Sequence, residues 1–285
     1  MPLKEIKFTK MHGAGNDYVY INCFEEKVDD PSKLALLMSP RHFSVGSDGV
    51  ILICPSTKAD AQMRMFNADG SEGKMCGNGI RCVGKYLYDN NIVKKDVIKV
   101  DTLSGVKTLK ITDEGGKAAL IGVDMGIPEF CADKIPVLFK EKTMINQKVE
   151  VCKKEYFITA VSMGNPHAVI FLDDVRNLNL NEIGPYFENL EIFPQRVNTE
   201  FVKVISEKRL EMRVYERGSG ETLACGTGAC ACVAAAVKNG ICKIGEEITV
   251  DLLGGSLLIT YMQNGHIYMR GGAQKVYDGV FSYES

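Results

Sequence analysis

The chain carries an internal repeat at a single offset of 149 positions. This offset superimposes Gly15-Asn16 on Gly164-Asn165, and the Cys-Gly-x-Gly step at 76–79 on the same step at 225–228, without a gap. Across residues 62–79, six of eighteen positions match their counterparts, whereas average residue usage would give about one match by chance. Solenoid repeats recur every 20–50 residues, roughly, so this longer period predicts two duplicated domains related by a pseudo-twofold axis.

The length of 285 residues accommodates two domains of about 140 residues each. We predict an N-terminal domain at 1–124, completed by 273–285, and a C-terminal domain at 125–272. Each is expected to be an α+β domain in which a mostly antiparallel sheet wraps around one central helix. Because a pseudo-twofold axis brings equivalent loops face to face, the active site is expected in the cleft between the domains.

Each half shows the same order of local patterns around its Cys-Gly-x-Gly step. An alternating strand pattern, at 61–66 or 210–215, leads into a polar glycine-rich turn, and a helical pattern follows the cysteine. The second helix, Ala229–Val237, is rich in Ala and Cys and stops at Lys-Asn-Gly. Both motifs are therefore predicted at strand–turn–helix junctions. Further strands are predicted at 18–23, 50–54, 97–100, 106–111, 168–172, 201–205, 248–252 and 256–261, with hairpin turns at 113–116 and 264–265.

The composition is that of a globular protein acting on a small molecule. A net charge of −2 provides no field to recruit nucleic acid or an anionic membrane. The N-terminal sequence lacks the apolar stretch of a signal peptide, which predicts a cytoplasmic location. Most of the ten cysteines are then expected to be reduced. Five of them are interpreted as small core residues: Cys23, Cys54, Cys131, Cys152 and Cys242.

The two motif cysteines, Cys76 and Cys225, are the candidate catalytic residues. A cysteine at a helix N-terminus lies at the positive end of the helix dipole, so its thiol pKa is expected to fall from about 8.5 toward neutrality. The N–H groups that follow, in Gly77-Asn78 and Gly226-Thr227, form two sites suited to a carboxylate. One carboxylate held between both helix ends would present its α-carbon to both sulfur atoms.

Such a pair suits the inversion of an amino-acid stereocentre. Removal of the α-proton builds negative charge on the carboxylate, and N–H donors fixed there stabilise the transition state without an external electron sink. Inversion also needs a thiolate on one face to take the proton and a thiol on the other face to return one. The sequence therefore predicts acid/base chemistry with no cofactor and no metal.

Other uses of the cysteines have weaker support in the sequence. A structural or redox disulfide does not suit a cytoplasmic chain without a Cys-x-x-Cys motif. Zinc would need Cys76 with Cys82, or Cys225 with Cys230 and Cys232, and these spacings differ from paired Cys-x-x-Cys knuckles. Neither Cys-Gly-x-Gly step continues as a dinucleotide fingerprint, and no local pattern marks a Schiff-base lysine.

Several segments together resemble one family along nearly the whole chain. They are FTKMHGAGNDYVYI (8–21), RHFSVGSDGVILI (41–53), MRMFNADGSEGKMCGNGIRC (63–82), VSMGNPHAVIF (161–171), RVNTEF (196–201) and YERGSGETLACGTGA (215–229). In order and spacing they resemble diaminopimelate epimerase. The resemblance implies interconversion of LL- and meso-2,6-diaminopimelate, for lysine and cell-wall synthesis, without pyridoxal phosphate or metal.

The resemblance also implies roles for individual residues. Cys76 and Cys225 would be the acid/base pair, and His167 and Glu216 would tune the two thiols. The substrate-binding residues would be Asn16, Asn67, Gly77, Asn78, Asn165, Asn198, Glu216, Arg217, Gly226 and Thr227. The tyrosine of the closing strand, Tyr277, would lie at the interface of a homodimer.

Two positions depart from the family pattern. Many members have Gln where this chain has Gly49, which puts one substrate contact in doubt. The usual Thr-Gly-Pro-Ala near the C-terminus reads Arg270-Gly271-Gly272-Ala273 here, which puts the role of that loop in doubt.

Three other functions remain as alternatives. A racemase or epimerase of the proline racemase type would place His rather than Asn after the first Cys-Gly, where this chain has Asn78. A PhzF-like isomerase fits less well because both cysteines are present. A non-catalytic module that binds a diamino acid is a third hypothesis, from a different class.

Overall fold

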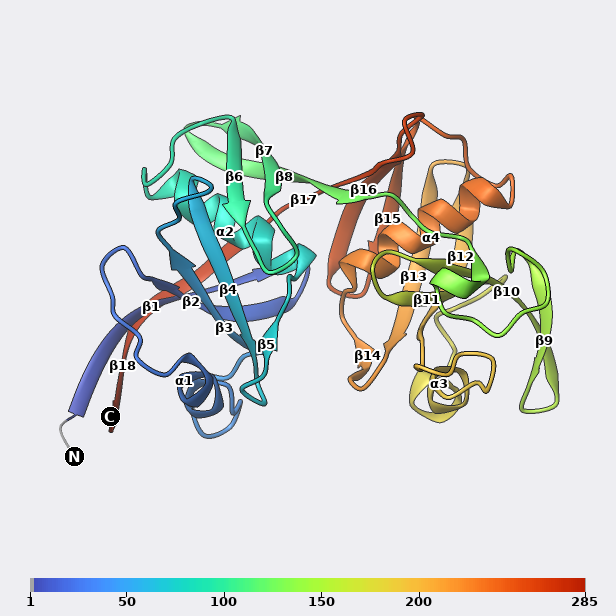
Figure 1. Cartoon of the computed structure of the whole chain (residues 1–285), viewed down its shortest axis with the longest axis horizontal. Helices are drawn as coiled ribbons and strands as arrows, with labels where there is room; N and C mark the ends of the chain where they lie inside the picture. The colour runs from blue at the N-terminus through green and yellow to red at the C-terminus, as the bar shows by residue number, and fades with distance from the viewer. Residues whose placement is uncertain (1–2, 285) are drawn as a thin grey trace. The chain divides into compact units, whose positions relative to one another are not determined.

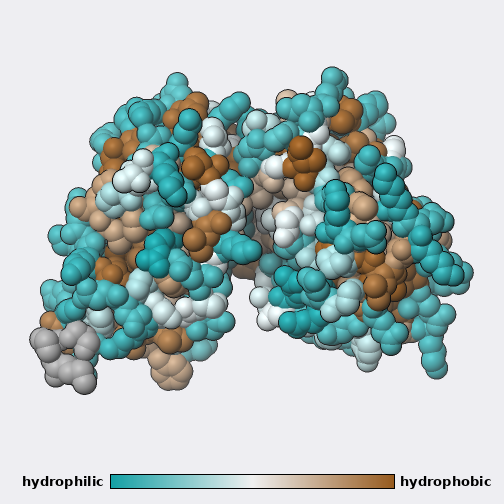
Figure 2. Space-filling model, viewed as in Figure 1, coloured by the Kyte–Doolittle hydropathy of each residue, from teal (hydrophilic) through white to brown (hydrophobic). Residues whose placement is uncertain are grey.

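The structure, a computed structural model, describes residues 3–284 and divides into two compact units (Figure 1). The first unit contains the chain up to Val123 and the residues from Gly271 on, and the second contains Asp124–Arg270. Strands dominate both units, so the α+β class is confirmed. The face of each unit seen in Figure 2 is mostly hydrophilic. Among the described residues, no helix combines the length and apolarity that crossing a bilayer would need.

The first unit contains two helices, α1 (Pro31–Met38) and α2 (Gly77–Asp89). Its strands are β1 (Leu3–Gly13), β2 (Asn16–Asn22), β3 (Gly49–Cys54), β4 (Ala61–Asn67), β5 (Glu72–Gly73), β6 (Val97–Asp101), β7 (Lys107–Glu114), β8 (Lys117–Gly126) and β18 (Gln274–Glu284).

The second unit contains α3 (Leu180–Glu188), α4 (Gly226–Lys238) and a short 3₁₀ helix at Ala132–Lys134. Its strands are β9 (Gln147–Val151), β10 (Lys154–Ser162), β11 (Pro166–Phe171), β12 (Asn198–Ser206), β13 (Arg209–Glu216), β14 (Gly220–Thr222), β15 (Glu247–Leu252), β16 (Gly255–Tyr261) and β17 (Ile267–Gly271).

The two units repeat one sheet topology. In the first, the strands pair in the order β18-β1-β2-β3-β4-β6-β7-β8, where β2–β3 and β4–β6 are parallel and the other pairs are antiparallel. In the second, the order is β9-β10-β11-β12-β13-β15-β16-β17, where β11–β12 and β13–β15 are parallel. The sequence repeat is therefore a structural duplication.

A central helix lies against each sheet (Figure 1). Helix α2 contacts the neighbouring strands β1 and β2 and also β7, which is distant from them in the sheet order, so the sheet curves around the helix. Helix α4 likewise contacts β10, β11, β12 and β16. Ala229–Ala236 of α4 is buried throughout, as the Ala- and Cys-rich sequence predicts, because only small side chains let strands approach a helix from several sides.

Two features of the fold differ from the sequence predictions. Helices α1 and α3 were not predicted; they bury Leu34 and Phe187 in separate cores of their own units. Of the five cysteines interpreted as core residues, only Cys242 is buried; Cys23, Cys54 and Cys131 are half-buried, and Cys152 is exposed. Cys152 and Lys153 form the turn between β9 and β10, where both residues have positive φ (51° and 62°) and the side chains point into solvent.

Candidate active site

Both motif cysteines are N-cap residues of the central helices. Cys76 has extended backbone angles, and its Sγ accepts a hydrogen bond from the Gly79 N–H at 3.3 Å. Cys225 caps α4 in the same way, accepting from the Gly228 N–H at 3.4 Å. Each thiol thus replaces the hydroxyl or carboxylate that usually occupies this position. The predicted strand–turn–helix junctions are confirmed in both units.

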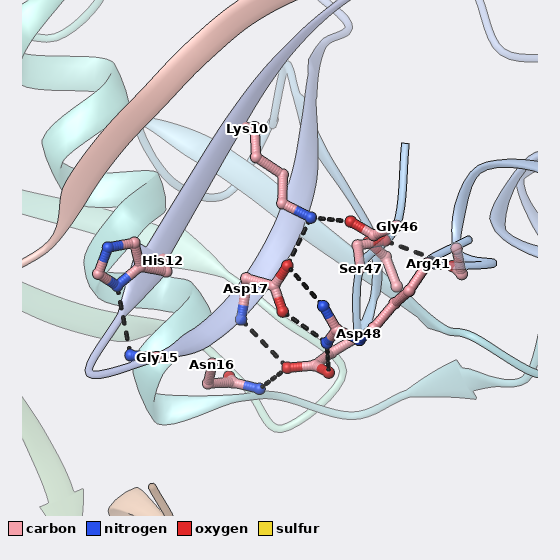
Figure 3. Close-up of polar contacts among 11 residues, drawn as sticks. Lys10, His12, Gly15, Asn16, Asp17, Arg41, Gly46, Ser47 and Asp48 are labelled. Carbon is pink, nitrogen blue, oxygen red and sulfur yellow. Dashed lines mark hydrogen bonds and ion pairs between the residues drawn. The ribbon is translucent and has the colours of Figure 1, made fainter. Parts of the chain in front are cut away.

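Cys76 lies beside the first asparagine of the repeat. Its Sγ donates to Asn16 Oδ1 at 3.2 Å. The other end of this amide, Nδ2, donates to Asp48 Oδ2 at 2.7 Å, and Arg41 Nη2 donates to Asp48 Oδ1 at 2.7 Å (Figure 3). Neither Asp48 nor Arg41 was predicted as a site residue.

Cys225 lies at one end of a chain of polar contacts that leads into the buried interior. Its Sγ is 3.4 Å from Thr227 Oγ1, which accepts from Asn165 Nδ2 at 3.4 Å. Asn165 Oδ1 is 3.1 Å from His167 Nε2, and His167 Nδ1 is 2.6 Å from Glu200 Oε1. Both His167 and Glu200 are 0% exposed. The structure thus brings Thr227, Asn165 and His167 together at Cys225.

Glu216 is also close to Cys225. Its carboxylate accepts from the Thr222 hydroxyl, and its charge acts on the Cys225 thiol. Burial raises the pKa of Glu216. Burial, followed by the charges of Glu216 and Glu200, raises the pKa of Cys225 well above its ordinary value. The prediction that the helix N-terminus lowers this thiol pKa is therefore wrong for Cys225, because desolvation and two carboxylates outweigh the helix dipole.

The two units differ in the ionisable residues near their cysteines. At the offset of 149, three ionisable residues of the second unit replace residues of another kind in the first: His167 replaces Tyr18, Glu200 replaces Ile51 and Glu216 replaces Asn67. Carboxylates therefore surround Cys225, whereas an amide oxygen accepts from Cys76. The sequence prediction missed Glu200 because it lies in an otherwise strand-like run, and its one signal is a charged residue in a strand buried from Asn198 to Val202.

Asn78 is part of the support of α2. Its Oδ1 accepts from Arg81 Nη2 at 2.9 Å. Arg81 is fully buried and also donates to the carbonyls of Gly77 and Gly272. In the loop that departs from the family pattern, Gly272 thus supplies a hydrogen-bond acceptor for Arg81.

Asn198 and Arg217 are brought together by the backbone. Asn198 Oδ1 accepts from the Arg217 N–H at 3.0 Å, and its Nδ2 donates to the Pro166 carbonyl at 3.0 Å. Arg217 Nη1 donates to the Gln195 carbonyl at 2.9 Å. Asn198 therefore anchors the turn that carries Arg217.

Gly49 and Asn67 face each other across β3 and β4. Gly49 has φ of +152°, and a Cβ there would lie 2.0 Å from the Phe66 carbonyl oxygen. The backbone of this chain thus excludes the Gln that many family members have. Asn67 Nδ2 donates to Ser71 Oγ at 3.0 Å rather than to Cys76.

Tyr277 lies on β18 and is 43% exposed, with its ring edge-on to Phe8 at 5.9 Å.

Solved structures share this fold at low sequence identity. A phenazine biosynthesis protein of the PhzF family from Bacillus anthracis has a TM-score of 0.70 and 16% identity, covering 98% of this chain and 99% of that one. A hydroxyproline epimerase from Agrobacterium vitis has a TM-score of 0.67 and 14% identity, covering 99% and 92%. These structures place the chain in a class of proteins that share one duplicated α+β fold.

The sequence comparisons are more specific. The family model for diaminopimelate epimerase matches residues 8–131 and 159–276. A diaminopimelate epimerase from Acetivibrio thermocellus is 53% identical over 275 residues, covering 96% of this chain and 98% of the relative. The chain belongs to the diaminopimelate epimerase family.

Proposed function

We propose that this chain is a cofactor-independent amino-acid epimerase that interconverts LL- and meso-2,6-diaminopimelate. One observation carries the proposal beyond family membership: each half of the duplication caps its central helix with a thiol. Each thiol is linked to the equivalent asparagine of its own unit: Cys76 directly to Asn16, and Cys225 to Asn165 through Thr227. The activity follows if the two helix ends face one another across a bound amino acid.

The α-carboxylate of the substrate binds between the helix N-termini in this proposal. The first intrahelical bonds run from Ile80 N to the Cys76 carbonyl and from Ala229 N to the Cys225 carbonyl. The N–H groups of Gly77-Asn78 and Gly226-Thr227 precede these bonds and lie at the positive helix ends. As the α-proton leaves, charge builds on the carboxylate, and these donors stabilise it.

The proton steps use the different surroundings of the two thiols. Glu216, whose pKa burial raises, accepts the proton of Cys225 as the sulfur removes the α-proton from one face of the substrate. Cys76, which holds its proton toward Asn16 Oδ1, delivers a proton to the opposite face. The reverse reaction runs through the same groups with their roles exchanged.

The other substrate contacts follow the family resemblance. Asn67, Asn198 and Arg217 would recognise the distal amino and carboxylate groups of diaminopimelate, which need both donors and acceptors. We further propose a homodimer through Tyr277 and a cytoplasmic location, where the thiols stay reduced. Size-exclusion chromatography with light scattering on Tyr277→Asp tests the interface, since a charge there should give a monomer.

Turnover of LL-diaminopimelate by cysteine variants tests the function. Cys76→Ser and Cys225→Ser should each abolish epimerisation while keeping the circular dichroism spectrum, because a serine hydroxyl is too weak an acid for this exchange. Cys152→Ser, at an exposed turn, is the matched control and should keep full activity. Near-normal turnover in either catalytic variant contradicts the mechanism, and turnover of 4-hydroxyproline alone would place the chain in the alternative function.

A further inference from the structure

We propose that Asp48 is a positioning residue that fixes the Asn16 amide against the Cys76 thiol, a role that rests on the proposed epimerase function. Figure 3 shows the polar contacts from Lys10 through Asp17, Arg41 and Asp48 to Asn16. All of these residues belong to the first unit.

The Asn16 amide has two chemically different ends, and its orientation decides what Cys76 meets. An amide can rotate by half a turn and exchange its oxygen with its NH₂ group. An ionised carboxylate only accepts hydrogen bonds, so Asp48 Oδ2, 2.7 Å from Nδ2, selects the orientation with NH₂ toward Asp48. The oxygen is then left facing Cys76 Sγ at 3.2 Å, where it keeps the thiol as a hydrogen donor.

Asp48 is itself held rigidly. Its backbone N–H donates to the Asp17 carbonyl at 2.8 Å, and its carbonyl accepts from the Ala68 N–H at 3.1 Å. Its carboxylate accepts from the Asp17 N–H at 3.1 Å and from Arg41 Nη2 at 2.7 Å. A group fixed by four hydrogen bonds can hold a fifth partner, Asn16, in one orientation.

The adjacent carboxylate, Asp17, has a different task. It pairs with the same guanidinium at 2.8 Å and with the buried ammonium of Lys10 at 2.5 Å. The Lys10 side chain is only 8% exposed and also donates to the Gly46 carbonyl. Asp17 therefore neutralises a buried cation, whereas Asp48 orients the amide beside the thiol.

The second unit orients its asparagine by other means. At the offset of 149, the residue equivalent to Asp48 is Val197, which has no carboxylate to hold Asn165. Instead Asn165 Oδ1 is turned to His167, and its NH₂ group donates to Thr227. The carboxylate contact to Asn16 is thus specific to the Cys76 half, which is why the repeat gives no sign of it.

A double-mutant cycle on kcat/KM for diaminopimelate tests whether Asp48 acts through Asn16. Asp48→Ala should lower kcat/KM about 10- to 100-fold, the loss typical of a misplaced contact at a reacting group. In an Asn16→Ala background the same substitution should cost less than about threefold, because the partner is already absent. Equal losses in the two backgrounds would overturn the proposal.

Asp17→Ala is the matched control, since it removes the neighbouring carboxylate of the same ion-pair network. It should lower the thermal midpoint more than Asp48→Ala does, because Lys10 is left buried without its anion. It should lower kcat/KM by less than about threefold. If the variant that loses more stability also loses more activity, the effect of Asp48 is structural only.

Alkylation by iodoacetamide gives a readout that needs no substrate. In Asp48→Ala the Asn16 amide can turn its NH₂ toward the sulfur, which favours the thiolate, so Cys76 should react at least about threefold faster. The rate at Cys225, followed by peptide mapping, should not change. An unchanged Cys76 rate would refute the positioning role, whereas absence of epimerisation by the unmodified chain would refute the function and leave this result standing.

Discussion

Alanine at the third position of each central helix should affect the two units very differently. Gly79 in α2 and Gly228 in α4 are equivalent in the repeat. A Cβ at Gly79 would lie 2.7 Å from Ile51 Cδ1, whereas a Cβ at Gly228 would lie 2.7 Å from Glu200 Oε1. The distances are equal, but the neighbours differ in whether they can move.

The structure gives the size of the difference. Ile51 Cδ1 is the free end of an apolar side chain and can rotate at a cost of about 0.5–1.5 kcal/mol, which the helix preference for Ala over Gly, about 1 kcal/mol, offsets. Glu200 Oε1 is buried and bound to His167 at 2.6 Å, so moving it breaks a charge-assisted hydrogen bond. Loss of that bond and overpacking together cost about 2–4 kcal/mol after the same offset.

Thermal unfolding followed by circular dichroism measures the pair. Gly228→Ala should lower the midpoint by roughly 4–15 °C and Gly79→Ala by less than about 3 °C. Activity should fall in Gly228→Ala as well, because Glu200 holds His167 and through it Asn165. Equal midpoint losses in the two variants, or a tolerated Gly228→Ala, would show that Glu200 is free to move and that its contact with His167 does not matter.

Two further predictions concern ionisation and oxidation. Because burial raises the pKa of Glu216, its ionised form costs stability above the ordinary Glu pKa of about 4.3 and costs nothing below it. Glu216→Gln should therefore raise the thermal midpoint at pH ~7, lose that gain below pH ~4, and abolish turnover. Hydrogen peroxide should inactivate the enzyme reversibly through a Cys76–Cys225 disulfide, with bound substrate protecting it. Peptide mapping must separate this bridge from one between Cys23 and Cys54, whose thiols also interact.

Opposite results are informative for both. If Glu216→Gln has a lower thermal midpoint than the parent chain at neutral pH, the ionised carboxylate stabilises the fold, contrary to the prediction. Inactivated protein in which Cys76 and Cys225 stay free would show that the two helix ends do not face one another.

The two cysteines could be predicted from the sequence because their signal is local and doubled. A Cys-Gly-x-Gly step after a turn places the thiol at the N-cap whatever surrounds it, and the repeat marks both copies. The sequence also showed that Gly49 departs from the family pattern, in which many members have Gln. The reason for this glycine could not be predicted, because the clash between a side chain at position 49 and the Phe66 carbonyl depends on how β3 and β4 pair.

The groups that set the chemistry of each thiol could not be found this way. Glu200 is brought to the site by the pairing of β12 with β11, and Asp48 by the segment that precedes β3. Their equivalents at the offset of 149 are Ile51 and Val197, so the repeat does not mark either carboxylate. The pKa of Cys225 was misjudged for the same reason. A helix end is visible in sequence, whereas a carboxylate brought in by a neighbouring strand is not.

The central claim is that two thiols act on opposite faces of one carbon. The most direct test is α-proton exchange of LL-diaminopimelate in D₂O, followed by NMR at early turnover. Because proton removal and return use different groups, the meso product should carry deuterium while the remaining LL substrate keeps its protium. Deuterium appearing in the remaining substrate as fast as in the product, or protium retained in the product, would mean that a single base serves both faces and would contradict the account.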